Sequence, residues 1–132
     1  MIRRAKNKEE EIGAIYNLIN DAAIKGSILA RSHDEIGEVI NGFYVAVEDE
    51  RIVGCCAIEV YNRKLAEIRS LVVVSEYRGR GIAKRLVEAC LEDAREKGVM
   101  EVITITDKDA FFEKTGFKKV LNGQWAMFVK FE

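Results

Sequence analysis

The spacing of apolar residues along the chain predicts a succession of short strands and amphipathic helices. Alternating or consecutive apolar residues are typical of strands, whereas apolar residues that recur every three to four positions are typical of helices. By this criterion, strands are predicted over residues 2–5, 43–47, 52–60, 65–74, 102–106, 117–121 and 125–131. Helices are predicted over residues 8–23, 33–40, 82–97 and 109–115.

Capping residues support two of these helices. Asn7 precedes the first helix, and Ser32 and Glu35 have the spacing of a capping box before the second. The order of elements is β-α-α-β-β-β-α-β-α-β-β, and its strand–helix–strand portion implies a right-handed parallel crossover. We therefore predict an α/β fold with a mixed sheet of about seven strands. No linker or repeat interrupts it, which predicts a single domain over residues 1–132.

The stretch from Ala66 to Ala94 organises the chain, because it contains a strand, a glycine-rich turn and a helix. Gly79 and Gly81 allow a backbone with positive φ and close approach to a ligand. Their N–H groups, together with the first turn of the helix, would form a cradle for an anion such as a phosphate. A tight glycine-capped turn with solvated arginines is the alternative. The turn is neither a Walker A loop nor a dinucleotide fingerprint, since both of those consensus patterns are missing.

Composition narrows the classes of function. The 132 residues are 48% hydrophobic and 33% charged, with a net charge of −1, which predicts neither nucleic acid nor a membrane as partner. The three cysteines and His33 lack metal-ligand spacing, so we expect no metal site and no disulfide framework. The charged N-terminal residues do not form a signal peptide, and the expected location is the reducing cytoplasm.

The segment Arg78-Gly79-Arg80-Gly81-Ile82-Ala83 fits R/Q-x-x-G-x-G/A, and in this the chain resembles the GNAT acetyltransferases. Phe111 to Phe117 resembles the short helix that leads into the last strand pair of that family. The resemblance implies a GNAT fold with a splayed central strand pair, and acetyl-CoA as cosubstrate. It assigns the coenzyme to the backbone of Leu71, Val72 and Val73, and to Arg78, Gly79, Arg80, Gly81, Ile82, Ala83 and Lys84.

Glu67 is the predicted catalytic base. It shares a strand face with Arg69, and the resemblance implies that a glutamate on this strand removes a proton from the attacking amine. The alternative is a solvated cross-strand charge pair.

Phe112 stands where many relatives have a tyrosine that protonates the thiolate, and phenylalanine cannot do so. Its ring remains a predicted coenzyme contact, and the thiolate then leaves unassisted or takes a proton from water. Cys55 and Cys56 lack an adjacent base, so we expect direct attack in a ternary complex rather than an acetyl-cysteine. Trp125, Phe128 and Phe131 are predicted core and edge residues of a closing hairpin.

A narrower likeness concerns the acceptor. Gly26 to Ser32, Phe43 to Ala46 and Ala66 to Leu71 resemble the acetyltransferase domain of bacterial N-acetylglutamate synthases. The likeness implies that Arg31, with Arg69 and Ser70, binds the carboxylates of a small amino acid such as glutamate, in arginine biosynthesis. Arg31 as a simple loop charge is the alternative. Another amine (a polyamine, an antibiotic, a protein N-terminus or a lysine) and a non-catalytic acyl-CoA sensor stay open, as does a homodimer.

Overall fold

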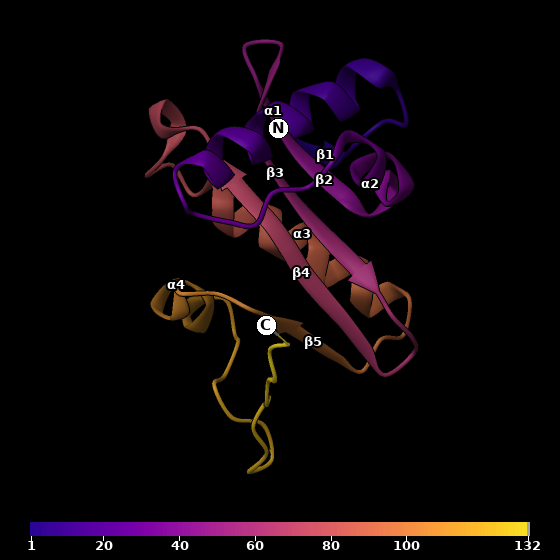
Figure 1. The fold of residues 1–132 in the computed structure, drawn as a ribbon, viewed down its shortest axis with the longest axis vertical. Coiled ribbons are helices and arrows are strands. Elements are labelled where there is room, and N and C mark those ends of the chain that lie inside the picture. Colours follow the sequence, from indigo (N-terminus) through magenta and orange to yellow (C-terminus); the bar gives the residue numbers. More distant parts are fainter. Residues whose placement is uncertain (132) are drawn as a thin grey trace.

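A mixed sheet with helices on both faces organises the chain in the computed structural model, which describes residues 1–131 (Figure 1). The elements are β1 (Ile2–Arg4), α1 (Glu9–Ile24), α2 (His33–Glu38), β2 (Phe43–Glu48), β3 (Arg51–Val60), β4 (Leu65–Val73), α3 (Ile82–Glu96), β5 (Glu101–Thr104) and α4 (Asp109–Lys114). Single 3-10 turns cover Ile40–Gly42 and Ser75–Tyr77. The strands lie in the order β1-β2-β3-β4-β5. Only β4 and β5 are parallel, as the crossover through α3 requires.

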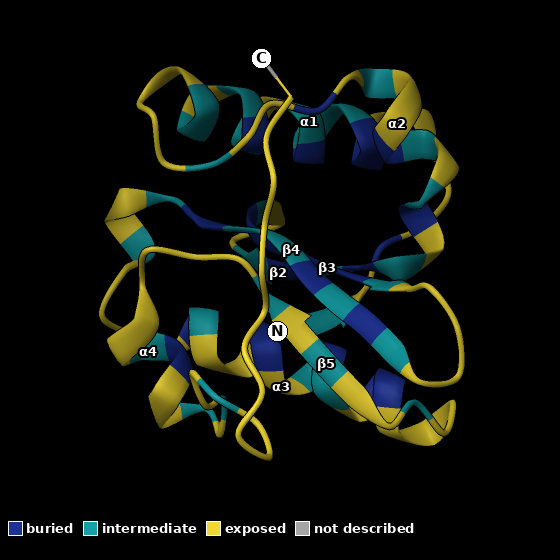
Figure 2. Ribbon diagram, turned by 60° about the horizontal axis from the view of Figure 1, so that its bottom comes forward, coloured by how far each residue is buried: buried dark blue, intermediate teal, exposed yellow. Residues whose placement is uncertain are grey.

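Two apolar cores form because neighbouring residues of β3 point to opposite faces of the sheet. Helices α1 and α2 cover one face, and α3 covers the other (Figure 2). Ile15, Phe43 and Cys55 belong to the core under α1 and α2. Cys56 and Leu86 belong to the core under α3. Each helix therefore has one apolar stripe and one solvated stripe, which is the pattern that its sequence shows.

A side-chain cap marks the start of α2 but not that of α1. The predicted capping box is present, since the Ser32 hydroxyl accepts from the Glu35 N–H and the Glu35 carboxylate accepts from the Ser32 N–H. The prediction for Asn7 is wrong. Lys8 occupies the N-cap of α1 without a side-chain hydrogen bond, and the three glutamates that follow favour this end of the helix dipole.

The predicted closing hairpin is not formed, and the sheet has five strands rather than about seven. Between Phe117 and Phe131 the structure has only an isolated bridge between Leu121 and Gln124. Trp125, Phe128 and Phe131 are 69%, 72% and 92% exposed, so none of them is a core residue. Figure 2 shows this segment running as an exposed extended chain across the front of the molecule. A two-stranded hairpin that packs on no third strand is marginal in water, which accounts for the difference.

A buried carboxylate joins β1 and β2, at one edge of the sheet, to α3. Asp93 is 4% exposed and accepts a hydrogen bond from the Tyr44 hydroxyl at 3.0 Å. Its oxygens lie 3.1 Å from Arg4 and 3.0 Å from Lys97. Burial by itself would raise the pKa of Asp93, but the hydrogen bonds from Lys97 and Tyr44 outweigh it and hold that pKa below its usual value. The carboxylate therefore stabilises the fold in its charged form.

Replacing Asp93 with asparagine is expected to lower the free energy of unfolding by about 1–3 kcal/mol, because the amide cannot pair with two cations. Since the folded-state pKa lies below the ordinary value of 3.8, this contribution is present at neutral pH and is lost as the pH falls below that value. Urea titrations of wild type and Asp93→Asn should thus differ at neutral pH and converge in acid. Asp21→Asn, at an exposed pair with Lys25, is the control and should change stability by less than about 0.5 kcal/mol. Equal stability at neutral pH would contradict this account.

Candidate active site at the break in strand β4

Strand β4 is interrupted by a bulge in its middle. Arg69 pairs with Ala57 and Val72 pairs with Cys55, so Ser70 and Leu71 together face the single residue Cys56. Ser70 adopts a φ of +59°, which residues other than glycine rarely do, and its carbonyl accepts from the Cys55 thiol at 3.3 Å. Bulges re-aim side chains and release backbone groups from the ladder. The break therefore separates the two halves of the strand.

Beyond the bulge, β4 also separates from β5. Their parallel pairing runs from Leu65 opposite Glu101 to Ile68 opposite Thr104, and the Thr104 hydroxyl donates to the Ile68 carbonyl at 3.0 Å. β5 ends at this point, whereas β4 continues to Val73. The β5-facing edge of β4 therefore has no strand partner there among the described residues. The pairing therefore ends in the strand pair for which the resemblance implied a splay.

The turn after β4 has the backbone that its glycines predict. Gly79 and Gly81 both have a φ of +78°, and Gly81 is the N-cap of α3. A Cβ at either position would meet no atom within 4 Å, so the space above the turn is open. The first N–H groups of a helix have no partner within the helix. The turn therefore presents unpaired donors at the positive end of the dipole of α3.

Two arginines of this turn brace it although both remain exposed. Arg78 donates through Nε to the Val73 carbonyl at 3.1 Å. The Arg80 guanidinium lies over the Tyr77 ring, 4.7 Å from its centre, and the Tyr77 hydroxyl donates to Asp49 at 2.7 Å. These contacts fix the turn to the end of β4 and to the β2–β3 connection while leaving both positive charges at the surface.

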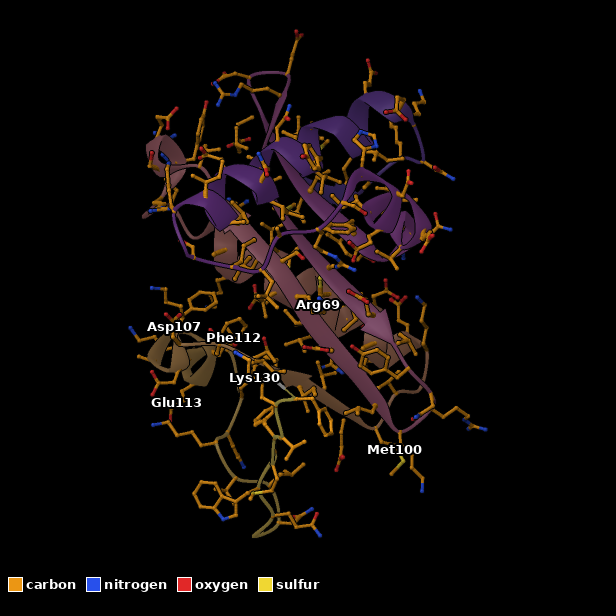
Figure 3. All side chains as sticks on the ribbon, viewed as in Figure 1. Arg69, Met100, Asp107, Phe112, Glu113 and Lys130 are labelled. Atoms are coloured by element: carbon orange, nitrogen blue, oxygen red, sulfur yellow. The ribbon has the colours of Figure 1, made fainter. Side chains whose placement is uncertain are left out.

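Charged side chains gather on the half of the sheet that α1 and α2 leave uncovered. Ile58 and Ile68 point into the core under α3, so Glu59 on β3 and Glu67 and Arg69 on β4 point to the other face. Figure 3 shows Arg69 near the middle of the molecule, between the α1 and α2 layer and α4. The Tyr61 hydroxyl donates to the Glu67 carboxylate. Burial and this hydrogen bond raise the pKa of Tyr61 to about 12, so its phenol stays protonated.

Arg31 reaches this cluster from the loop between α1 and α2, which crosses the face of the sheet (Figure 1). Its Nη1 lies 2.8 Å from Glu59 Oε2 and 3.4 Å from the Ser70 hydroxyl. Arg69 approaches the same Glu59 oxygen at 3.5 Å. The residue is only 6% exposed, and its buried Nε has no hydrogen-bond partner among the described residues. A buried donor without a partner costs stability, so this position is not explained by stability alone.

Of the predicted acceptor residues, the structure brings Arg31 to Ser70 and, through Glu59, to Arg69. The sequence prediction included Glu67 but omitted Glu59 and Tyr61. Glu59 belongs to β3 and Tyr61 directly follows the end of that strand, and Glu59 lies directly opposite Glu67 in the pairing of β3 with β4. The signal was the alternation of polar and apolar residues from Ile58 to Tyr61, which puts Glu59 and Tyr61 on one strand face. Without the pairing register, that face could not be matched to the face of Glu67.

The remaining candidates lie in the core or on the far surface. Phe112 is 5% exposed and packs edge-to-face against Phe111 and Phe117, so its ring is a core residue. Cys55 and Cys56 are fully buried, and burial raises the pKa of Cys55 to about 12. Neither thiol is therefore suited to act as a nucleophile. His33 lies 3.1 Å from Glu9 on the surface of α1 and α2.

Two further observations concern other classes of function. None of the helices in residues 1–131 is long and apolar enough to span a membrane. Over the same residues, no three histidine, cysteine, aspartate or glutamate side chains are grouped so that they could hold a metal ion.

The comparison with known proteins agrees with this geometry. The sequence profile of the Acetyltransferase (GNAT) family matches residues 12–117. An uncharacterized N-acetyltransferase of Chlorobaculum tepidum is 41% identical over 110 residues, which cover 83% of this chain and 71% of that protein. An amino-acid acetyltransferase of Mycobacterium tuberculosis is 29% identical over 123 residues, which cover 91% of this chain and 69% of that protein.

A solved structure gives the same result. A Mycobacterium tuberculosis protein crystallised with CoA and NLQ superimposes with a TM-score of 0.84 at 29% identity, covering 92% of this chain and 73% of that one. The chain therefore belongs to the GNAT family, and it is an acetyl-CoA-dependent N-acetyltransferase.

Proposed function

We propose that this enzyme acetylates the α-amine of a small amino acid, with glutamate as the first acceptor to test. The observation that carries the proposal is Arg31, a buried guanidinium with an unsatisfied Nε, held beside the bulge of β4. A planar guanidinium fork suits a carboxylate, and Arg69 offers a second one nearby. The amino-acid acetyltransferase of Mycobacterium tuberculosis, 29% identical, supports the same class of acceptor.

For the coenzyme, we assign the pyrophosphate to the glycine turn and the pantetheine arm to the unpaired edge of β4. The open space above Gly79 and Gly81 and the free N–H groups at Ile82, Ala83 and Lys84 fit an anion. The backbone of Leu71, Val72 and Val73 lies along the edge that β5 leaves, while Val72 and Val73 bury their side chains. The Mycobacterium tuberculosis structure in complex with CoA supports the coenzyme as the ligand of this fold.

Glu67 is the group that we assign to proton removal. A free amine is mostly protonated at neutral pH, because its pKa lies at about 8 to 10, so it must lose a proton before it attacks. The hydrogen bond from Tyr61 fixes the Glu67 carboxylate, and Arg69 lies two positions along the same strand face. Glu67 would accept the proton directly or through water.

The rest of the transfer needs polarisation of the thioester and release of the thiolate. The bound thioester supplies an activated acetyl group. We assign polarisation of its oxygen to backbone N–H groups at the break in β4, where regular pairing is lost. The Phe112 ring cannot donate a proton, and thiolates are modest bases, so we assign protonation of the thiolate to water. With the thiols of Cys55 and Cys56 buried, the acetyl group passes directly to the amine.

The decisive experiment measures release of free coenzyme A from acetyl-CoA across a panel of amines. Turnover with glutamate above all other amines supports the proposal. Turnover with a polyamine, an aminoglycoside or a peptide N-terminus as the best substrate would reject the amino-acid acceptor and leave the acetyltransferase activity. Coenzyme binding without turnover on any amine would favour a sensor.

Gly81→Glu should weaken coenzyme A binding by more than about tenfold, because it brings a carboxylate into an anion cradle. Gly98→Glu is a matched control. Gly98 follows the other end of α3, its φ of +74° is close to the +78° of Gly81, and its Cβ position is equally open. Both variants should lose similar thermal stability, and only Gly81→Glu should lose affinity in calorimetry. Equal affinity in the two variants would rule out the turn as the pyrophosphate site.

Glu67→Gln should lower kcat by about a hundredfold to ten-thousandfold with an unchanged KM for acetyl-CoA. The amide can still accept the hydrogen bond from Tyr61, so the change removes the base with little disturbance of the site. The rate should recover partly at higher pH, where the amine loses its proton unaided. Glu101→Gln, on the exposed start of β5, should behave as wild type. If Glu67→Gln has the wild-type rate at every pH, Glu67 is not the base and its role is structural.

Arg31→Ala should raise the KM for glutamate by about thirty- to a hundredfold, since a charge-assisted pair contributes about 2–3 kcal/mol. The KM for acetyl-CoA should not change. Arg31→Lys should recover only part, because a point charge cannot replace the planar fork. Arg63→Ala, in the exposed β3–β4 turn, serves as the control. If Arg31→Ala changes thermal stability alone and leaves the KM for glutamate as it was, Arg31 does not bind the acceptor.

A further inference from the structure

Glu59 already lies where an acceptor carboxylate would approach Arg31. Its Oε2 is 2.8 Å from the Arg31 guanidinium and 3.5 Å from that of Arg69. The Arg31 side chain is 4% exposed and the Glu59 side chain is 15% exposed, so solvent screens this contact only weakly. Both guanidinium groups assigned to the acceptor thus share one carboxylate supplied by the protein itself.

The charges of the site balance. Arg31 and Arg69 bring two positive charges, and Glu59 and Glu67 bring two negative charges from directly opposite positions of β3 and β4. The protonated phenol of Tyr61 adds no charge. An acceptor therefore enters a site without net charge. Without the Glu59 carboxylate, the same site would carry a charge of about +1 and would favour a more negative acceptor.

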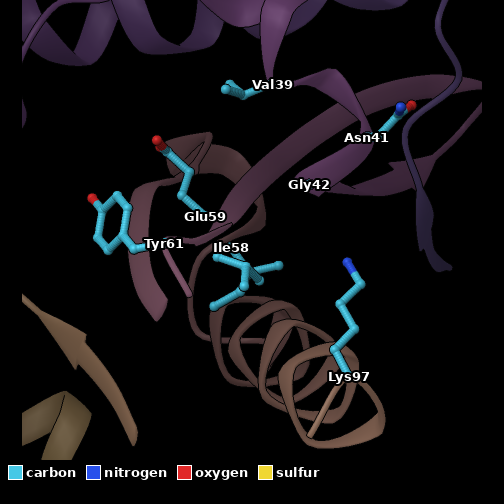
Figure 4. A pocket seen from close by; sticks show the side chains of 8 residues that line it. Val39, Asn41, Gly42, Ile58, Glu59, Tyr61 and Lys97 are labelled. Atoms are coloured by element: carbon cyan, nitrogen blue, oxygen red, sulfur yellow. The ribbon is translucent and has the colours of Figure 1, made fainter. Parts of the chain in front are cut away.

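Glu59 is also accessible to a ligand. It lines a cavity of about 290 Å³ with Tyr61, Val39, Asn41, Gly42 and Lys97. Figure 4 shows Glu59 and Tyr61 projecting to one side of the strand, with Lys97 on the other. Neither Arg31 nor Arg69 lines this cavity. The direct contacts of Glu59 Oε2 with both guanidinium groups are what would bring an acceptor carboxylate beside Glu59.

We propose that Glu59 determines acceptor specificity, because it competes with the acceptor carboxylates for Arg31 and Arg69. The competition limits how much negative charge the enzyme accepts, and it lowers the preference for a dicarboxylic amino acid over its neutral amide. The proposal rests on the amino-acid acceptor proposed above. It assigns Glu59 a role in specificity that Glu67, the proposed base, does not have.

The test compares glutamate with glutamine, which differ only by a carboxylate in place of an amide. Glu59→Gln keeps an oxygen that accepts from Arg31 and removes the competing charge. We expect the ratio of kcat/KM for glutamate to that for glutamine to rise about five- to tenfold over wild type. In the Arg31→Ala background, the same substitution should raise the ratio by much less, because only the longer contact of Glu59 with Arg69 remains. Glutamate binding to the enzyme loaded with coenzyme A, measured by calorimetry, should tighten in parallel in Glu59→Gln.

Glu88→Gln removes the same charge from the exposed face of α3 and should leave the ratio at its wild-type value. Glu59→Asp retains a charged partner for buried Arg31, and it should raise the ratio by less than Glu59→Gln does. If wild type acetylates neither amino acid, the proposed acceptor is wrong and this proposal fails with it. If wild type acetylates glutamate but the ratio is unchanged or lower in both Glu59 variants, the role of Glu59 alone is overturned.

Discussion

The rest of the structure depends on the loss of regular pairing in the second half of β4. A regular strand would bind both neighbours along its whole length and would leave no backbone donor for a ligand. Here the bulge at Ser70 and Leu71 shifts the register against β3, and β5 ends at Thr104 while β4 continues. Both changes occur within a few residues of β4. The first half of the strand is therefore paired on both edges, and the second half offers a free edge for the coenzyme next to the residues proposed to bind the acceptor. The helices on either face pack around this break without closing it.

The same break explains why a buried charge cluster is tolerated. Arg31 would be expensive to bury alone, since desolvation of a guanidinium costs several kcal/mol. The Glu59 carboxylate and the hydroxyl of Ser70, turned at the bulge, supply partners on two sides. One donor remains without a partner, and the fold bears that cost at the position where specificity would be set. Asp93 shows the contrasting case, because three partners satisfy it and it serves stability.

The sequence predicts those elements whose structure depends on residues close together in the chain. The change from a period of two to a period near four at Ile82, and the glycines before it, located β4, the turn and α3 correctly. The capping box at Ser32 located α2. The predictions failed for segments whose structure depends on contacts with residues distant in the sequence. The apolar alternation from Trp125 to Phe131 suggested a strand, but that segment finds no neighbouring strand within residues 1–131. Glu59 became a site residue only through its register with β4 and its contact with Arg31.

The adjacent cysteines of β3 have a consequence for how this molecule can be observed. Cys55 lies in the core under α1 and α2, whereas Cys56 lies in the core under α3 with Cys90. None of the three thiols is accessible in the folded state, so a thiol-specific reagent can reach each only after its own layer opens. The labelling rate of Cys55 thus reports on detachment of α1 and α2, and the rates of Cys56 and Cys90 report on detachment of α3. The labelling rates of two neighbouring residues in β3 thus measure the opening of the two faces of the sheet separately.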